Sequence, residues 1–231
     1  MEVVSDFDGT IVEIDTVEYL LAQYANGNWR RYDDLFERGE ISLEECLRQQ
    51  YGMIRESKKK LLDAVDNVAS FRTGIDDLLA FSKKEGNSFT IVSAGLDFVI
   101  RHLLRHKNVQ NQITVLAPRS ELTSRGIVLD FSRLPQGISP NFKRNAVRSI
   151  KAKGTSVAYI GDGFSDFEAI KEARIRFVIK GSRLAEQCKK YGILCHEIVS
   201  LEEVTYYLTG ARMRVHRDVE AKSARPNSGR R

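Results

Sequence analysis

The sequence predicts an α/β protein, in which a parallel sheet flanked by helices is interrupted by an inserted helical cap. Short apolar runs of strand length alternate with helical patterns of about 10–15 residues from residue 73 onward. Residues 16–72 carry helical periodicity only. Polar, mostly acidic segments follow several of the apolar runs. Alternation of this kind is typical of parallel sheets, because consecutive parallel strands are joined by crossover helices.

We divide the chain into a core, a cap and a tail. The core is expected to comprise residues 1–15 and 73–211, the cap residues 16–72, and the tail residues 212–231. The net charge of +5 lies in the tail, which holds seven Lys/Arg and two Asp/Glu, whereas the rest of the chain is neutral. We expect this short basic tail to be disordered.

The first strand is the apolar pair Val3-Val4, which leads into the acidic segment 6–10. Helices of the cap are expected to begin at Asp15 or Thr16, at Ser42 and at Ser57, since these residue types accept hydrogen bonds from the first backbone N–H groups of a helix.

The remaining elements alternate along the core. Thr73 is expected to cap a helix that stops at Gly86, and Ser124-Arg125-Gly126 is expected to form a hairpin turn within residues 118–140. Further strands are predicted at 89–92, 113–116, 157–160 and 176–179, and further helices around 99–104, at 146–154, at 164–173 and after Ser200.

Composition excludes several classes of protein. The cysteines Cys46, Cys188 and Cys195 are too few and too scattered for a disulfide framework, and we interpret them as reduced thiols. No apolar run approaches the roughly 18–20 residues that cross a bilayer, and no signal peptide precedes the first strand. We therefore expect a cytoplasmic protein without membrane contact. The histidines are interpreted as surface or core residues without ligand spacing: His102, His106, His196 and His216.

Polar side chains gather where ligands bind in such sheets, beyond the carboxyl ends of the strands. The set that the sequence places there is Asp6, Asp8, Ser93 with Ala94 and Gly95, Asp162 and Asp166, with Lys143 near the start of a helix. Clustered carboxylates require a cation, and oxygen ligands favour Mg²⁺. Of Asp6 and Asp8, one could attack phosphorus and the other could protonate the leaving oxygen. The pattern thus predicts phosphoryl transfer.

These residues also carry a resemblance. Asp6-Phe7-Asp8-Gly9-Thr10 resembles the DxDxT motif of the haloacid dehalogenase superfamily. Ser93 is similar to its second motif, Lys143 to its third, and Asp162 with Asp166 to its GDxxxD fourth motif. The resemblance covers residues 1–210 and implies a Rossmann-like core of this superfamily.

The resemblance implies a role for each position. Asp6 would be the nucleophile and a Mg²⁺ ligand, and Asp8 the general acid/base that also binds Mg²⁺ through its carbonyl. Thr10 would hold the Asp8 loop in place and contact phosphate. Asp162 and Asp166 would bind Mg²⁺. The residues expected to bind phosphate are Ser93, Ala94, Gly95 and Lys143. An aspartate at position 8 marks the phosphatase branch. The expected partner is a small phosphorylated metabolite, acted on by a monomer or homodimer.

The cap resembles the phosphoserine phosphatase-like branch, which includes phosphoserine phosphatase and 2-hydroxy-3-keto-5-methylthiopentenyl-1-phosphate phosphatase. Asp15 and Gln50 stand where phosphoserine phosphatases carry a glutamate and a carboxylate-binding arginine, so both are candidate substrate-binding residues. Gln50 cannot form a charged clamp, and Arg48 is expected on another face of the helix. This weakens the case for phosphoserine as the substrate. The region 118–140 resembles the methionine-salvage enzyme instead. The sequence leaves both substrates open.

Three other functions fit part of the sequence. The same intermediate could serve a phosphotransferase, because the acceptor is chosen by the cap. The basic tail could guide a phosphatase for nucleic-acid ends, although no aromatic–basic binding module accompanies it, so nucleic acid is not an expected partner. A regulatory protein on a retired fold would bind metal and phosphate without turnover.

Overall fold

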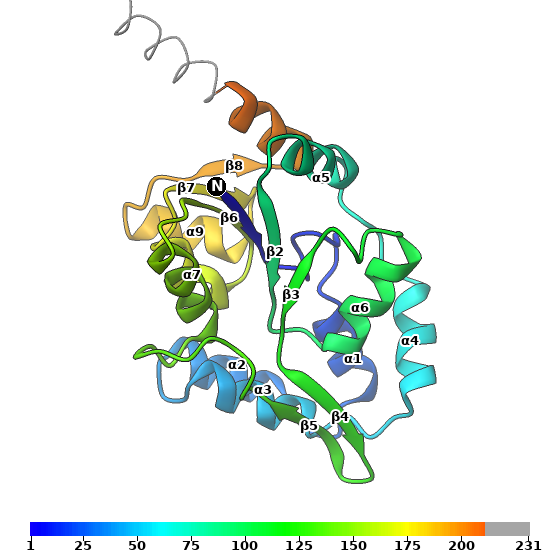
Figure 1. The fold of residues 1–231 in the computed structure, drawn as a ribbon. Helices are drawn as coiled ribbons and strands as arrows, with labels where there is room; N and C mark the ends of the chain where they lie inside the picture. The colour runs from blue at the N-terminus through cyan, green and yellow to red at the C-terminus, as the bar shows by residue number, and fades with distance from the viewer. Residues whose placement is uncertain (211–231) are drawn as a thin grey trace, which may run out of the picture.

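The computed structural model describes residues 1–210, which form a parallel sheet covered by helices on both faces (Figure 1). All neighbouring strands of the sheet run parallel. In spatial order the strands are β3 (Thr114–Leu116), β2 (Ser88–Val92), β1 (Glu2–Ser5), β6 (Val157–Gly161), β7 (Ile175–Ile179) and β8 (His196–Ile198). The predicted fold class is confirmed, and the predicted disorder of residues 212–231 concerns positions outside the described residues.

The central strands are apolar because helices cover both of their faces. Every residue of β6 and all but the first residue of β1 and β2 are buried. The helices of one face are α5 (Ile75–Lys84) and α6 (Asp97–His106), and those of the other are α7 (Phe142–Ala152), α8 (Phe167–Ile170) and α9 (Arg183–Lys190). The chain changes face between β3 and β6, so the strand order reverses beside β1, where ligands bind in such sheets.

Four helices separate β1 from α5 in the sequence. They are α1 (Thr16–Tyr24), α2 (Arg30–Glu37), α3 (Leu43–Tyr51) and α4 (Lys58–Asp66). The capping residues predicted from the sequence are confirmed, because Asp15, Ser42 and Ser57 each accept a hydrogen bond from a backbone N–H in the first turn. Below we call residues 16–66 the helical insertion.

The predicted hairpin is also confirmed, as β4 (Arg119–Thr123) and β5 (Gly126–Asp130), which pair antiparallel. It packs against α3 of the insertion rather than against the sheet (Figure 1). Arg48 on α3 donates a hydrogen bond to the carbonyl oxygen of Leu129 at 2.6 Å, and its guanidinium lies over the Phe131 ring. A Cβ atom on Gly126 would lie only 2.0 Å from the carbonyl oxygen of Gly52, so the two backbones are in direct contact.

Some predicted boundaries are wrong. The N-cap position of α5 is held by Gly74, not Thr73. The predicted helix at 164–173 is a short 3-10 turn, Phe164–Asp166, followed by the single turn of α8. Helix α9 and strand β8 were not predicted, and a further helix occupies residues 201–210 as expected. Among the described residues, no helix combines the length and apolarity that a membrane span needs.

Candidate active site

Asp6 lies at the carboxyl end of β1, in the middle of the sheet. Its backbone N–H donates to the Ile160 carbonyl of β6, which fixes the loop that follows β1. One carboxylate oxygen accepts from the Phe7 N–H at 2.7 Å, and the other accepts from Lys143 Nζ at 2.7 Å. The side chain is almost fully buried, yet it lines a cavity, described below, between the sheet edge and the helical insertion. Asp6 is therefore held rigidly, with one face open to a ligand.

Lys143, on α7, joins two carboxylates in a fully buried ion pair. Its Nζ lies 2.7 Å from Asp6 and 2.7 Å from Asp166. Asp166 also accepts hydrogen bonds from the Tyr159 hydroxyl at 2.7 Å and from the backbone N–H groups of residues 162 and 163. Both oxygens of Asp166 are thus occupied by donors, so this residue fixes Lys143 and the loop after β6.

Asp162 faces the loop of Asp6 from the end of β6. Its carboxylate accepts from the Thr10 hydroxyl at 2.6 Å, and a Cβ atom on Gly9 would come within 2.2 Å of it. Gly9 has a φ of +68°, a conformation that other residues adopt at a cost. The buried Thr10 hydroxyl is committed to Asp162, and Thr10 is not among the residues that line the cavity, so its expected contact with phosphate stays a prediction.

Three carboxylates converge here with only one lysine to balance them. Oxygen atoms of Asp6, Asp162 and Asp166 lie within 4.8 Å of one another. Burial, and then the charge of Asp166, raise the pKa of Asp6 well above its usual value and the pKa of Asp162 to about 7. Burial alone would lower the pKa of Lys143, but the charges of Asp166 and Asp6 outweigh it and raise that pKa. The oxygen donors and the excess negative charge fit Mg²⁺.

Asp8 is held by the first residue of the helical insertion. One oxygen of Asp8 accepts from the Thr16 backbone N–H at 3.1 Å and from the Thr16 hydroxyl. Burial, followed by the charge of Asp15, raises the pKa of Asp8 to about 7, while the two bonds from Thr16 oppose this rise. Sequence analysis considered Thr16 only as a possible helix cap and missed its contact with Asp8, although a threonine so close to the acidic motif was a usable signal.

The loop after β2 forms another side of the site. Ser93 is fully buried, and its hydroxyl accepts from the Gly95 N–H at 2.9 Å. A Cβ atom on Gly95 would lie 2.4 Å from an Asp8 oxygen, so glycine is needed for Asp8 to sit here. The Ala94 carbonyl accepts from the hydroxyl of Tyr51 on α3 at 2.7 Å, which joins the insertion to this loop. As predicted, residues 93–95 border the cavity beside Asp6.

The helical insertion walls a cavity of about 570 Å³, a volume typical of small-molecule sites. Its apolar lining comprises Val17, Leu21, Trp29, Phe36, Leu43, Leu47 and Phe164. Its acidic lining beyond Asp6, Asp8 and Asp162 comprises Asp15, Glu18, Asp33, Asp34 and Glu37. Arg30 and Arg183 also line it, but each is already paired with a glutamate, Glu18 and Glu37 respectively.

The two further predicted substrate-binding residues, Asp15 just before the insertion and Gln50 within it, both line this cavity. Asp15 also caps α1 through the Glu18 N–H at 2.8 Å. The Gln50 amide donates to Asp33 at 2.7 Å and to the Trp29 carbonyl at 3.3 Å, so its N–H groups are directed at protein atoms. Arg48, which was expected on another face of the helix, binds the hairpin and is not among the residues that line the cavity.

Arg72 is a positioning residue that sequence analysis missed. Its guanidinium donates to the carbonyl oxygens of Gly9 and Thr10, at 2.7 Å each. Arg72, which follows Thr10 by 62 residues in the sequence, thereby holds the loop that carries Asp8. No local pattern marks a contact of this separation.

A family profile for haloacid dehalogenase-like hydrolases matches residues 3–171, more than half of the chain. The 2-hydroxy-3-keto-5-methylthiopentenyl-1-phosphate phosphatase of Bacillus velezensis is 25% identical over 196 residues, covering 83% of this chain and 82% of the relative. The protein of the same name from Exiguobacterium sibiricum is 26% identical over 202 residues, covering 84% and 89%.

Solved structures agree with this result at the level of the fold. A substrate-bound phosphoserine phosphatase complex superposes with a TM-score of 0.68 at 18% identity, covering 89% of this chain and 96% of the other. A probable phosphoserine phosphatase from Vibrio cholerae superposes with a TM-score of 0.68 at 16% identity, covering 93% and 66%. With the family profile, the strand order and the four motifs in agreement, the chain belongs to the haloacid dehalogenase-like hydrolases.

Proposed function

We propose that this protein is a Mg²⁺-dependent phosphomonoesterase that acts through an aspartyl-phosphate on Asp6. One observation carries the proposal: the Asp6 carboxylate lies at the cavity wall, 2.7 Å from a buried lysine and beside the oxygens of Asp162 and Asp166. A carboxylate can attack an anionic phosphate only where positive charge offsets their repulsion. Lys143 supplies part of that charge.

The first half of the reaction transfers the phosphoryl group to the protein. A carboxylate oxygen of Asp6 attacks phosphorus as the bond from phosphorus to the ester oxygen breaks. The Asp8 carboxyl group, whose pKa of about 7 keeps it partly protonated at neutral pH, gives its proton to the departing oxygen. The loop 93–95 holds the phosphoryl oxygens, and Lys143, which is fully buried between Asp6 and Asp166, supplies positive charge behind the Asp6 carboxylate. Mg²⁺, if held by Asp6, the Asp8 carbonyl and Asp162, would supply further charge neutralisation, and Asp166 would support the site through Lys143.

The second half releases phosphate. Asp8, now a carboxylate, removes a proton from a water molecule as that water attacks phosphorus. The bond between phosphorus and the Asp6 oxygen breaks, which restores the free Asp6 carboxylate. Both roles require Asp8 to face the cavity, and the contacts of Thr16 and Gly95 hold it there.

The cavity favours the substrate that the curated relatives are named for, 2-hydroxy-3-keto-5-methylthiopentenyl-1-phosphate. Such an ester ends in a methylthio group and carries no charge beyond its phosphate. Trp29, Leu21 and Leu47 offer apolar surface to such a tail. Phosphoserine would need a cation for its carboxylate, and both arginines that line the cavity in the described part of the chain are paired with glutamates.

The acidic lining also bears on the alternatives. Asp33 and Asp34 would repel a polyanion, so the cavity gives no support to a phosphatase for nucleic-acid ends. Hydrolysis and transfer to another acceptor share every residue described so far, so only product analysis separates them. The cytoplasmic location and the monomeric or homodimeric state stay predictions.

Phosphate release from the methylthiopentenyl ester and from phosphoserine, measured side by side, tests the proposal. We expect a kcat/KM at least about tenfold higher for the first ester, since one discriminating polar contact corresponds to about 1.4 kcal/mol. Activity should vanish in Asp6→Asn and after chelation of Mg²⁺. The matched control is Asp63→Asn, an exposed carboxylate of the insertion whose ion pair within residues 1–210 is with Lys59.

Two results would contradict different parts of the proposal. Full activity of Asp6→Asn or of the chelated protein would overturn the mechanism. Preference for phosphoserine would leave the mechanism intact and overturn the proposed substrate.

A further inference from the structure

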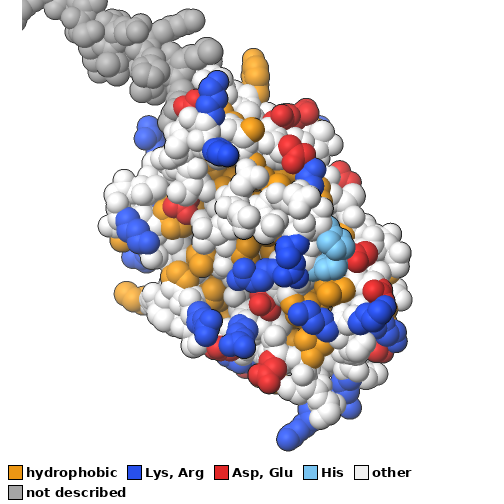
Figure 2. Space-filling model, turned by 45° about the vertical axis from the view of Figure 1, so that its right-hand side comes forward, with side chains coloured by type: hydrophobic (Ala, Val, Ile, Leu, Met, Phe, Trp, Pro, Cys, Tyr) orange, Lys and Arg blue, Asp and Glu red, His pale blue; other side chains and the backbone are white. Residues whose placement is uncertain are grey.

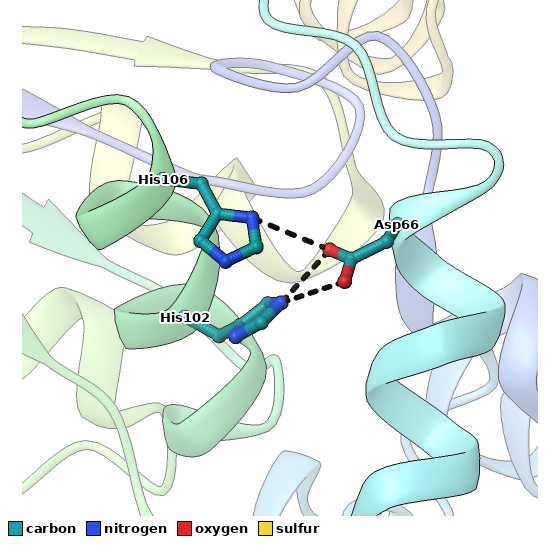
Figure 3. A group of neighbouring side chains, drawn as sticks. All are labelled: Asp66, His102 and His106. Carbon is teal, nitrogen blue, oxygen red and sulfur yellow. Dashed lines mark hydrogen bonds and ion pairs between the residues drawn. The ribbon is translucent and has the colours of Figure 1, made fainter.

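A second cluster of metal-binding side chains lies apart from the catalytic carboxylates and shares no residue with them. His102 and His106 stand one helical turn apart on α6, and Asp66 ends α4 of the insertion. Figure 3 shows both imidazoles directed at the Asp66 carboxylate from the neighbouring helix. The interpretation of these two histidines as residues without ligand spacing is wrong, because positions i and i+4 of a helix present side chains on the same face.

The distances in this cluster suit a metal ion. His102 Nε2 lies 2.8 and 3.0 Å from the two Asp66 oxygens, and His106 Nδ1 lies 3.7 Å from one of them. All three ligand atoms fall within 4.8 Å of one another. Around a tetrahedral ion with bonds of about 2.0–2.2 Å, ligand atoms lie about 3.4 Å apart. The two separations from one Asp66 oxygen, 2.8 and 3.7 Å, lie on either side of this value.

The chemistry of the cluster selects a class of metal. Two imidazole nitrogens with one carboxylate oxygen favour Zn²⁺ and neighbouring transition metals, whereas Mg²⁺ prefers oxygen ligands. The side chains of His102, His106 and Asp66 are 16%, 60% and 34% exposed, so an ion could enter from solvent and keep water as its remaining ligand. Histidine side chains reach the surface of the face shown in Figure 2.

We propose that Asp66, His102 and His106 form a Zn²⁺-class metal site that joins the helical insertion to the core. Its ligands come from two segments, since α4 belongs to the insertion and α6 belongs to the core, where it follows the loop 93–95. A metal held here would tie these segments together at a point away from the cavity. The site is independent of the proposed phosphatase activity, and neither depends on the other being correct.

Metal titration of untagged, full-length protein tests the site. Saturating Mg²⁺ is present throughout to occupy the catalytic carboxylates. Calorimetry should then show one equivalent of Zn²⁺ bound, and Co²⁺ in its place should give the visible absorption of a low-coordinate nitrogen-ligated ion. Zn²⁺ at about 100 times its Kd should raise the Tm by about 5–10 °C.

Two ligand variants and two matched controls decide the outcome. Asp66→Asn and His106→Gln should each weaken Zn²⁺ binding by more than about tenfold and abolish the Tm rise. Asp63→Asn on α4 and Arg105→Gln on α6 change exposed neighbours and should bind like the unmodified protein. The Tm of each variant without Zn²⁺ verifies that it is folded. Equal Zn²⁺ binding by all five proteins, or no Zn²⁺-dependent signal in the unmodified protein, would overturn the proposal.

Discussion

Opposing effects set the pKa of Asp8, and the hydrogen bonds from Thr16 are the effect that a substitution can remove. Burial raises the pKa to about 7, whereas the hydrogen bonds from Thr16 stabilise the charged form and lower it. In Thr16→Val the hydroxyl bond is lost, so the Asp8 pKa should rise. A hydrogen bond to a charged group contributes roughly 1.5 kcal/mol, which corresponds to about one pH unit.

The pH dependence of Asp6 phosphorylation measures this change. The step needs protonated Asp8, so its rate falls as pH rises through the Asp8 pKa, and in Thr16→Val that fall should move about one unit higher. Thr16→Ser keeps the hydroxyl and should keep the original profile. An unshifted profile in Thr16→Val would show that Asp8 is not the titrating acid.

Replacing Lys143 should lower both the stability and the activity of the protein. It is fully buried between Asp6 and Asp166, so Lys143→Met leaves two buried carboxylates without their cation. Breaking such a pair costs about 3–5 kcal/mol of unfolding free energy, and loss of a charge-stabilising donor lowers kcat by at least about 100-fold. Denaturant unfolding and phosphate release measure the two effects.

The control for this variant is Lys151→Met on the same helix. Lys151 pairs with Glu172 at the surface, where solvent screens the interaction. Its stability and activity should stay close to those of the unmodified protein. If Lys143→Met were as stable as this control, the buried cluster would not be charged in the folded protein.

Among the elements, the β4–β5 hairpin depends on α3 for its position. Arg48 supplies both a hydrogen bond to Leu129 and a stacking contact with Phe131. Arg48→Ala should lower the unfolding free energy by about 1–2 kcal/mol and speed amide exchange across residues 119–130. Hydrogen exchange with mass spectrometry measures this segment directly.

Gln49→Ala is the comparison for Arg48→Ala, because Gln49 is exposed on the same helix and its side chain, among the described residues, bonds to Glu45 of that helix. Exchange across the hairpin should be unchanged in it. Equal exchange in both variants would mean that the backbone contact of Gly126 with Gly52 suffices to hold the hairpin.

Elements with a local signal were predictable from the sequence, and those without one were not. Ser42 and Ser57 marked their helices because capping acts within three residues. Strand β8 is a short edge strand, His196–Ile198, with one buried residue, so it lacks the apolar run that revealed β1 and β6. Helix α9 was missed because its sequence is mostly polar and buries only Leu184 and Cys188.

For the molecule as a whole, the excess of buried negative charge links stability to pH. Asp6, Asp8 and Asp162 all have raised pKa values in the folded state. Groups raised in this way stabilise the fold at low pH, and this contribution is lost as pH rises through their folded-state values, here about 7 for Asp8 and Asp162. Mg²⁺ should therefore raise the Tm more at about pH 8 than at about pH 5.5.

Thermal unfolding with and without Mg²⁺ at the two pH values measures this difference. In Asp162→Asn one of the carboxylates is neutral, so the metal-free protein should be more stable than the unmodified protein at the higher pH, and Mg²⁺ should stabilise it less. An equal effect of Mg²⁺ at both pH values would show that these carboxylates are not the groups that the cation neutralises.

The difference between local and distant contacts also explains which residues of the site could be predicted from the sequence. The motif residues could be predicted because the topology delivers every strand end to one edge. The residues that position them could not: Thr16 acts across eight positions, Arg72 across more than sixty, and the partner of Thr10 is Asp162. Such contacts depend on how the chain packs, which no local pattern contains.

The two ends of the helical insertion meet in a narrow neck. Val12 pairs with Phe71 as an antiparallel bridge, and the Glu13 and Arg72 N–H groups donate to the Ser70 and Ile11 carbonyls. The chain therefore leaves and re-enters the core at adjacent points, as in a hairpin loop. Any segment with equally close ends could be grafted at this neck without a change in strand order, so selectivity for the ester can diversify while the reacting carboxylates stay in register.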